Sequence, residues 1–475
     1  MNKILQNFRV ESDSCGSKNV PIEAYYGVQS LRAAENFNIT GRMMHKELIV
    51  SLAQVKKATA IANNEAGLMS KKIRDAIVKA SDEIIDGKLH DQFIIDSIQG
   101  GAGTSGNMNA NEVIANRANE ILGGKLGAYD KVHPNDHVNM GQSTNDVFPT
   151  AGKMAALKLM PRTLAELKKL SDVLLEKSEE FDDVIKMGRT QMQDAVPIRL
   201  GQEFNAYRSV IKRNIARLEK ATEGLKCVNM GASAIGTGIN VDTEYFKNIV
   251  PAINKVVNLD LHQAEDLVDG TQNVDVFVDV SSALKVCAVS LSKISNDLRL
   301  MSSGPRTGFG EINLPAKQNG SSIMPGKINP VIPEVMSQVS FNIIGNDVTI
   351  TMAAEAGQLE LNAFEPVIFY KLYESIETLA NGVNTLRRNC ITGITANRKR
   401  CKGLVDNSVG IITAIVPHVG YKVAAKIADK AIATGESVIE LVIKEGVLTK
   451  SQLNEILDTK AMTEPGIAAK HLMAI

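Results

Sequence analysis

Residues 320–334 read Gly-Ser-Ser-Ile-Met-Pro-Gly-Lys-Ile-Asn-Pro-Val-Ile-Pro-Glu, and no other stretch of the chain is as informative. Gly320 and Gly326 permit backbone conformations that are closed to other residues, while the prolines fix φ. The loop can therefore move, yet it presents two serines, a lysine and an asparagine in a defined order. A hydroxyl and a cation on such a loop indicate an enzyme that handles an anion.

The chain around this loop is dominated by long helical patterns. Apolar residues recur at helical spacing, and the stretch 202–222 contains neither Gly nor Pro. Further long helices are predicted over 276–300, 333–352 and 361–388. Several helices of this length, with few strands between them, predict a mainly α protein built on an elongated helix bundle.

The length of 475 residues exceeds one ordinary domain, so we expect more than one. Shorter helical patterns with Pro, Gly and Asn clusters come first, long helices follow, and short helices end the chain. We therefore predict three domains, over 1–144, 145–397 and 398–475. The segment 331–352 is apolar over a broad arc that one bundle would leave exposed, so oligomerisation is expected.

The composition excludes several functional classes. Apolar residues make up 44% of the chain but aromatic residues only 4%, which suits helix-on-helix packing. Lys plus Arg equals Asp plus Glu, at 53 each, so nothing suggests a nucleic acid or a membrane as partner. Five cysteines without a CxxC pair indicate a reduced protein, and neither a signal peptide nor a long apolar run is seen. The cytoplasm is the expected location.

Two motifs do not support the chemistry that their residues first suggest. The glycines 101, 103 and 106 match a dinucleotide-binding fingerprint, but that motif needs a βαβ unit and the surrounding pattern is helical. We predict instead a tight loop before a helix, whose N–H groups and Thr104 hydroxyl could bind a carboxylate; a plain capped turn fits equally well. His133 and His137 lack a third metal ligand and are separated by a proline, so a surface turn is favoured over zinc.

Polar residues also gather before a long helix and between two others. Ser143, Thr144 and Asn145 stand in succession at the positive end of a predicted helix, where they could coordinate an anion without a fixed charge. The segment 187–197 is polar and is read as a loop between two bundle helices. The small-residue segment 229–240 is read as a hinge or as a lining of the site.

Taken together, these segments resemble the aspartase/fumarase superfamily over essentially the whole chain. Residues 320–329 match its signature, and the stretches around Thr104, 143–145 and 188–191 match its other active-site regions. The chain is more similar to the aspartase branch, because Gln191 stands where class II fumarases have His. Some aspartases also have His at this position. A Gln is therefore good evidence against a fumarase, whereas a His would be weaker evidence for one.

The resemblance implies a three-domain fold whose central bundle assembles into a tetrameric multi-helix core. It implies an anti elimination in which L-aspartate gives fumarate and ammonia through an enediolate, with Ser321 as the base. Hydroxyls of Thr104, Ser143 and Thr144 would hold the carboxylate that develops this charge.

The remaining roles follow from the same resemblance. Thr190, Lys327 and Asn329 would hold the other carboxylate. Asn145 and Gln191 would contact the amino group, and the supporting residues are Ser322 and Glu334. The expected partners are a small dicarboxylate and three further copies of the chain, with each site shared between subunits. No cofactor is expected, and no metal ligands are predicted, although a divalent cation such as magnesium can activate enzymes of this type.

Two alternatives stay open. Fumarate hydratase would use the same fold with a different leaving group. A catalytically silent structural protein would keep the scaffold and lose the chemistry, but the intact Ser321, Lys327 and Asn329 argue against it.

Overall fold

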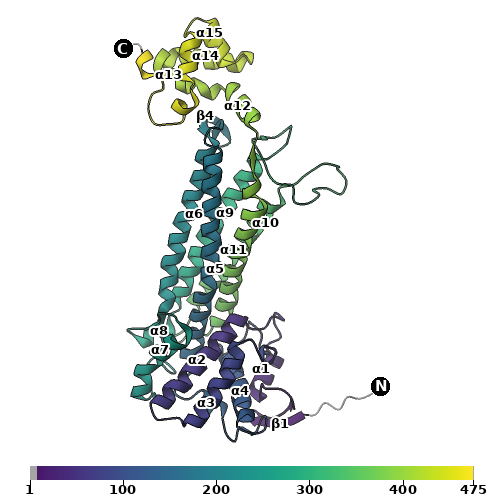
Figure 1. The fold of residues 1–475 in the computed structure, drawn as a ribbon, viewed down its shortest axis with the longest axis vertical. Helices are drawn as coiled ribbons and strands as arrows, with labels where there is room; N and C mark the ends of the chain where they lie inside the picture. The colour runs from purple at the N-terminus through teal and green to yellow at the C-terminus, as the bar shows by residue number, and fades with distance from the viewer. Residues whose placement is uncertain (1–7, 474–475) are drawn as a thin grey trace. The chain divides into compact units, whose positions relative to one another are not determined.

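The computed structural model describes residues 8–473, and its regular structure is mainly helical, as the sequence predicts (Figure 1). No helix within this range is long and apolar enough to cross a membrane. The long helices are α5 (Thr144–Glu180), α6 (Leu200–Glu223), α9 (Asp275–Met301), α10 (Val331–Glu355) and α11 (Glu365–Asn389).

The chain forms two compact units, each made of separate stretches of sequence. Each long helix contributes residues to both units, so the units are not sequential segments. The predicted division at residues 144 and 397 remains a prediction. Unit 1 comprises Met1–Leu164, Ala216–Val286 and Phe341–Ala380, and unit 2 comprises Ala165–Ile215, Cys287–Ser340 and Asn381–Ile475.

The predicted long helices agree with the observed ones to within a few residues, except at the start of α11. Asn362 explains the difference. Its side chain accepts a hydrogen bond from the Phe364 N–H at 2.8 Å and donates to the Ala353 carbonyl at 2.9 Å. These bonds hold a turn between α10 and α11, so α11 begins only at Glu365.

In the part of the chain that the structure describes, the strands are short and pair only in twos. Within residues 8–473 the single parallel pair is β5 with β6, two residues each, so no βαβ unit exists for a dinucleotide. The shorter elements of unit 1 are β1 (Phe8–Asp13), β2 (Gly16–Pro21), α1 (Val28–Asn36), α2 (Lys46–Glu65), α3 (Lys71–Ile85), α4 (Thr104–Ile121), β5 (Cys227–Val228), α7 (Thr243–Val257), β6 (His262–Gln263) and α8 (Leu267–Gln272).

Unit 2 adds two β-pairs and a group of small helices near the C-terminus. A capping box holds the start of the helix that begins at Lys450: the Thr449 hydroxyl accepts from the Gln452 N–H, and the Gln452 side chain accepts from the Thr449 N–H. The elements are β3 (Ile185–Thr190), β4 (Gln193–Arg199), β7 (Ile312–Asn313), β8 (Thr395–Ala396), α12 (Arg398–Asp406), α13 (Ile412–Val419), α14 (Tyr421–Thr434), α15 (Val438–Lys444), α16 (Lys450–Ile456) and α17 (Thr459–Met462).

The core of unit 1 concentrates much of the chain's small aromatic content. The Phe369 ring lies 5.3 Å from Phe148 and 5.1 Å from Phe277, centroid to centroid. A Cβ at position 152 would lie 2.1 Å from Phe369, so glycine there lets α5 and α11 approach closely. The Tyr373 hydroxyl then donates to the Gly152 carbonyl at 3.0 Å. This packing fixes the first half of α5, which begins with the polar residues of interest.

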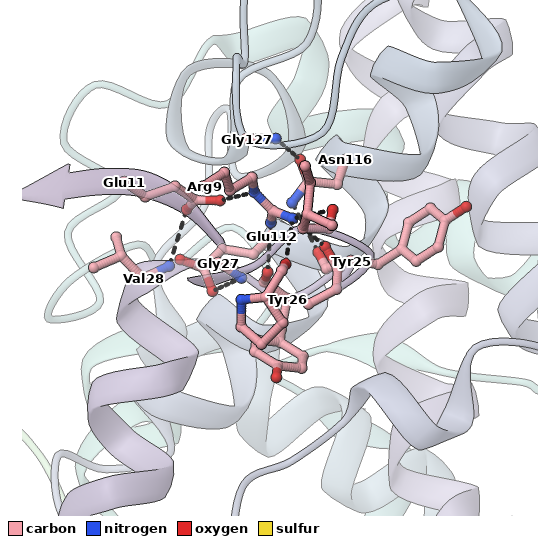
Figure 2. Close-up of polar contacts among 12 residues, drawn as sticks. Arg9, Glu11, Tyr25, Tyr26, Gly27, Val28, Glu112, Asn116 and Gly127 are labelled. Atoms are coloured by element: carbon pink, nitrogen blue, oxygen red, sulfur yellow. Dashed lines mark hydrogen bonds and ion pairs between the residues drawn. The ribbon is translucent and has the colours of Figure 1, made fainter. Parts of the chain in front are cut away.

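A buried polar cluster connects α1 to α4 in the same unit (Figure 2). The Glu112 carboxylate, on α4, accepts hydrogen bonds from N–H groups at the start of α1, including Gly27 at 2.9 Å. Arg9 donates to Glu11 and to the carbonyls of neighbouring loop residues, and Glu11 accepts from the Val28 N–H. A carboxylate at a helix N-terminus is stabilised by the helix dipole. The cluster therefore anchors α4, the helix that begins at Thr104.

Candidate functional site

Thr104 begins α4, as the sequence predicts, after three consecutive residues with positive φ: Gly101, Ala102 and Gly103. A Cβ on Gly103 would lie 2.4 Å from the Phe148 ring, and its φ of 85° is costly for other residues, so the position requires glycine. The Thr104 side chain is exposed. The loop thus presents a hydroxyl at the positive end of a buried helix, where an anion is favoured.

The Ser143–Asn145 segment lies at the start of α5, in the same unit as Thr104. The Ser143 hydroxyl accepts from the Asn145 N–H at 3.2 Å. The Thr144 hydroxyl accepts at 3.1 Å from Asn107, which lies one turn after Thr104 on α4. A hydrogen bond therefore connects the starts of α4 and α5. The two anion-binding stretches that the sequence predicts here, around Thr104 and at residues 143–145, lie next to each other.

A proline inside α5 supports this arrangement. Pro149 has no N–H, so the carbonyl four residues earlier, on Asn145, lacks its usual helical donor. Asn229 supplies the missing bond, donating to the Asn145 carbonyl at 2.9 Å, while the Asn145 side chain donates to the Ala234 carbonyl at 2.7 Å. The small-residue segment 229–240 therefore contacts Asn145. That the segment lines a site, one of the two sequence interpretations, stays a prediction. The Asn145 side-chain oxygen has no hydrogen-bond partner among the described residues and can accept one from a ligand.

Two buried charges under the α5 start were missed by the sequence analysis. The Asp146 carboxylate is fully buried and accepts from the N–H groups of Ser143, Gly231 and Ser233. Burial raises the pKa of Asp146 to about 6, against the effect of these hydrogen bonds. Burial also lowers the pKa of Lys56 to about 7, and the nearby Asp146 charge opposes that shift. No pattern in the sequence distinguishes Lys56 from a surface lysine.

Thr190 and Gln191 lie at the tip of a β-hairpin in unit 2. The sequence interpretation of 187–197 as a loop was wrong: β3 pairs with β4, with Thr190 opposite Gln193. Gln191 and Met192 form the two-residue turn with φ of 54° and 63°. Such a turn favours Asn and Gly, and a left-handed residue of another type costs about 1–2 kcal/mol. The backbone strain points to a functional reason for an exposed glutamine at this tip.

A buried ion cluster holds the base of this hairpin. Arg189 donates to Glu311 at 2.8 Å and stacks over the Phe309 ring, 4.1 Å from its centroid. The Lys186 ammonium lies 3.5 Å from the second Glu311 oxygen and 3.1 Å from Glu203. Burial raises the pKa of Glu203, against the effect of Lys186. The residue next to Thr190 is therefore fixed in place, while the tip itself is exposed.

The Ser321 loop closes on itself through backbone hydrogen bonds. The Ser321 hydroxyl accepts from the N–H groups of Ile323 at 3.2 Å and Met324 at 2.9 Å. The Gly320 N–H donates to the Lys327 carbonyl at 3.0 Å, and the Asn329 amide donates to the Gly320 carbonyl. A Cβ on Gly320 would lie 2.3 Å from the Lys327 carbonyl oxygen, so this closure requires glycine.

A pocket of about 970 Å³ in unit 2 brings several predicted residues together. Lys327, Asn329 and Glu334 line it, and so does Arg299, which the sequence analysis did not select. The Arg299 guanidinium lies 3.9 Å from the Glu334 carboxylate. A lysine, an arginine and an amide among the lining residues suit a carboxylate ligand. Ser321 and Ser322 do not line this pocket, and Ser322 is exposed on the loop.

The predicted site residues thus fall into three groups. Thr104 and residues 143–145 form one group in unit 1, while the hairpin tip and the 320–334 loop form two groups in unit 2. Within the described residues, no hydrogen bond or ion pair joins the Gln191 tip to the Ser321 loop.

The two histidines set aside as metal ligands are engaged locally. The His133 ring accepts from the N–H groups of Asn135 and Asp136, capping a short π-helix over Pro134–Val138. The His137 Nδ1 accepts from the His133 N–H at 2.9 Å. Within residues 8–473, no group of three or more His, Cys, Asp or Glu side chains is placed to hold a metal ion.

Comparison with protein families gives two matches. A family described as Lyase matches residues 16–345, and one described as Fumarase C C-terminus matches residues 411–464. Together these matches extend over most of the chain and include all three groups of predicted site residues.

Similar curated proteins share one description. An aspartate ammonia-lyase of Bacillus sp is 57% identical over 462 residues, which cover 97% of this chain and 99% of the relative. An aspartate ammonia-lyase of Bacillus subtilis (strain 168) is 54% identical over 98% of each chain. An aspartate ammonia-lyase of Escherichia coli (strain K12) is 46% identical, again over 98% of each chain.

Solved structures share the fold. A fumarate lyase:delta crystallin from Brucella melitensis bound to cobalt superposes with a TM-score of 0.94 at 48% identity, covering 97% of this chain and 100% of that one. A class II fumarase from Schistosoma mansoni superposes with a TM-score of 0.92 at 36% identity over the same shares.

Proposed function

Because this chain belongs to the lyase family of the aspartases and class II fumarases, we propose that it is an aspartate ammonia-lyase, which interconverts L-aspartate with fumarate and ammonia. The observation that carries the proposal is the near full-length likeness to curated aspartate ammonia-lyases at 46–57% identity. The solved class II fumarase is less similar, at 36%. Gln191 at the hairpin tip agrees with this choice.

Ser321 is the proposed base. In this step the Ser321 alkoxide takes the β-proton of aspartate, and the electrons of the broken C–H bond enter the adjacent carboxylate as an enediolate. A serine hydroxyl is a poor base unless its alkoxide is stabilised locally. The two N–H groups of Ile323 and Met324, aimed at the Ser321 oxygen, support this role, because hydrogen bonds to the charged form favour it.

The starts of α4 and α5 are suited to stabilise the enediolate. Thr104 and Ser143 bring hydroxyl groups to the positive ends of two helices, and Thr144 adds a third. Donors already in position when the charge develops can each contribute about 3 kcal/mol to lowering the barrier. When the enediolate collapses, the C–N bond breaks, the C=C bond forms and ammonia leaves.

The remaining polar residues would bind the other parts of aspartate. Thr190, Lys327 and Asn329 are proposed to hold the second carboxylate, and the pocket beside Arg299 supports this for the latter two. Asn145 would accept from the substrate ammonium through its side-chain oxygen, since its NH₂ group already donates to Ala234. Gln191 would make the corresponding contact from the hairpin tip, and Glu334 would orient Arg299.

We further propose a homotetramer in which one active site combines groups from different subunits. The loop supports this: Ile323 is 83% exposed, although it lies beside the proposed base. The α10 helix supports it as well, because Phe341 and Met352 are more than half exposed. Val348 is exposed on the same helix, and several exposed apolar residues along one helix favour a protein interface.

The proposal requires no cofactor. Activation by a divalent cation such as magnesium stays a prediction, and no set of residues in the described chain is assigned to hold one. The cobalt in the Brucella melitensis structure belongs to that protein alone.

One assay tests the function. Fumarate absorbance is followed with L-aspartate and, separately, with L-malate. Fumarate from aspartate is expected. Fumarate from malate alone would identify a hydratase, and none from either substrate would identify a catalytically silent scaffold.

A further inference from the structure

The Thr144 hydroxyl accepts one hydrogen bond, but its own proton has no acceptor among the described residues. The donor is the Asn107 NH₂ group, at 3.1 Å. The side chain is nevertheless largely buried, with Thr144 only 8% exposed. Buried hydroxyl groups are usually hydrogen-bonded, so a hydroxyl proton without an acceptor here points to a ligand.

The orientation of Asn107 is what makes Thr144 an acceptor. The Asn107 NH₂ group donates to both Thr144 and Asn139, the latter at 3.2 Å. The Asn107 oxygen is buried without a partner, so that end of the amide does not select the orientation. The selection must come from Asn139, whose side-chain oxygen accepts from Asn107.

Lys56 in turn helps to fix Asn139, whose side-chain oxygen also accepts from the Asn111 NH₂ group at 3.1 Å. The Lys56 amine is fully buried and donates to the side-chain oxygens of Asn139 and Gln142, both at 2.9 Å. It has at least two hydrogens to donate whether charged or neutral. Asn139 must therefore present its oxygen to Lys56, and its own NH₂ group donates to the Gln142 carbonyl at 3.1 Å. The direction of every hydrogen bond from Lys56 to Thr144 is thereby determined.

We propose that Lys56 and Asn107 are positioning residues that hold the Thr144 hydroxyl with its proton directed at the substrate carboxylate. Without them the hydroxyl could rotate and donate to a neighbouring amide oxygen instead. The developing enediolate would then lose a donor that is oriented before the reaction, which is the kind of donor that contributes most to catalysis. This inference rests on the proposed function and adds to it a reason for two buried residues that are not among the proposed substrate ligands.

A double-mutant cycle between Asn107 and Thr144 tests the proposal. Wild type, Asn107→Ala, Thr144→Val and the double variant are compared by kcat/KM for L-aspartate. Thr144→Val should lower kcat/KM about 10²-fold or more, as the loss of one such donor does. Asn107→Ala should lower it about 10-fold through kcat, and the double variant should be no worse than Thr144→Val alone. Thr144→Ser, which keeps the hydroxyl, should restore most of the activity.

The matched control is Asn109→Ala. Asn109 is buried on the same helix, but it hydrogen-bonds Ile94 and Gln92 instead of this network. Any effect of Asn109→Ala should multiply with that of Thr144→Val. If the losses in kcat/KM caused by Asn107→Ala and Thr144→Val also multiplied in the double variant, the proposal would be overturned. Independent losses are what a purely structural role of Asn107 gives, because such a role does not depend on the Thr144 hydroxyl.

The role of Lys56 is tested in the same cycle with Lys56→Met. If that variant does not fold, because it leaves Asp146 buried without a countercharge, Asn139→Ala breaks the same connection. Lys56→Met or Asn139→Ala should lower kcat/KM in the wild-type enzyme but not in the Thr144→Val variant. An equal loss in both would contradict a positioning role for Lys56. Fumarate production by the wild type separates the two hypotheses: its absence refutes the proposed function, while an active wild type with independent effects refutes only this inference.

Discussion

Arg189 and Glu311 form a salt bridge of 2.8 Å in which the carboxylate is fully buried and the guanidinium nearly so. The bridge lies directly next to the two predicted ligands Thr190 and Gln191, which are exposed at the hairpin tip. A rigid base below an exposed tip is what a binding group needs to be held in position without being covered.

Glu311→Gln should destabilise the protein by about 3 kcal/mol, because it leaves two buried cations short of a countercharge. Urea unfolding followed by circular dichroism measures the change. The matched control is Glu464→Gln, since Glu464 forms a more exposed bridge with Arg199 and such pairs contribute about 0–1 kcal/mol. Equal effects of the two substitutions would show that the buried bridge does not hold the hairpin.

Ser321→Ala should lower kcat by about 10³-fold or more, since it removes the proposed base itself. Initial rates of fumarate formation measure the loss. The circular dichroism spectrum and the molecular mass in solution should match those of the wild type, because among the described residues the hydroxyl bonds only within its own loop. Near-normal turnover in a folded variant would contradict the assignment of Ser321.

Lys327→Met should raise KM and lower kcat together, because the ammonium is proposed to hold a carboxylate in both the bound state and the transition state. A combined loss of about 10²–10³-fold in kcat/KM is expected for a charge-assisted contact. Lys327→Arg keeps the charge and should retain more affinity. An unchanged KM in Lys327→Met would remove Lys327 from the carboxylate site.

Glu365 should make the protein less stable as the pH rises. Burial raises the pKa of Glu365 to about 8, against the effect of Lys153. Between an unfolded-state pKa of about 4.3 and this value, the folded chain keeps a proton that the unfolded chain has lost. Each pH unit in that window therefore subtracts up to about 1.4 kcal/mol from the free energy of unfolding.

Glu365→Gln should remove this penalty, so its stability gain over wild type should grow from pH 5 to pH 8. Urea unfolding at both pH values measures the difference. Glu360→Gln, at an exposed position nearby, serves as the control and should show no such trend. A gain that is independent of pH would contradict the raised pKa of Glu365.

Hydrophobic periodicity was sufficient to predict the long helices, because each must bury a continuous apolar stripe. The prediction over 202–222 matches α6 closely for that reason. The start of α11 was misplaced because it depends on one side chain, Asn362, and its bonds to distant carbonyls. Polar residues before helices, such as Ser143 and Thr144, were also recognisable, since the unpaired N–H groups of a helix start need acceptors.

Other parts of the site could not be predicted from local sequence. Lys56 and Glu311 are buried charges whose partners lie far away in the chain, so each resembles an ordinary surface residue. The Gln191–Met192 turn was missed because its positive φ values contradict the residue types that usually indicate such a turn. These are positions where tertiary contacts override local preference.

The closure between Gly320 and Lys327 has a consequence for how the Ser321 loop can act. Hydrogen bonds join Gly320 to Lys327 and Asn329, so the segment from Gly320 to Asn329 forms one rigid unit. The base and the cation would travel together, and their spacing would be the same in an open and a closed position. Substrate capture would then require displacement of one rigid piece about its flanking residues, with no reassembly of the catalytic groups.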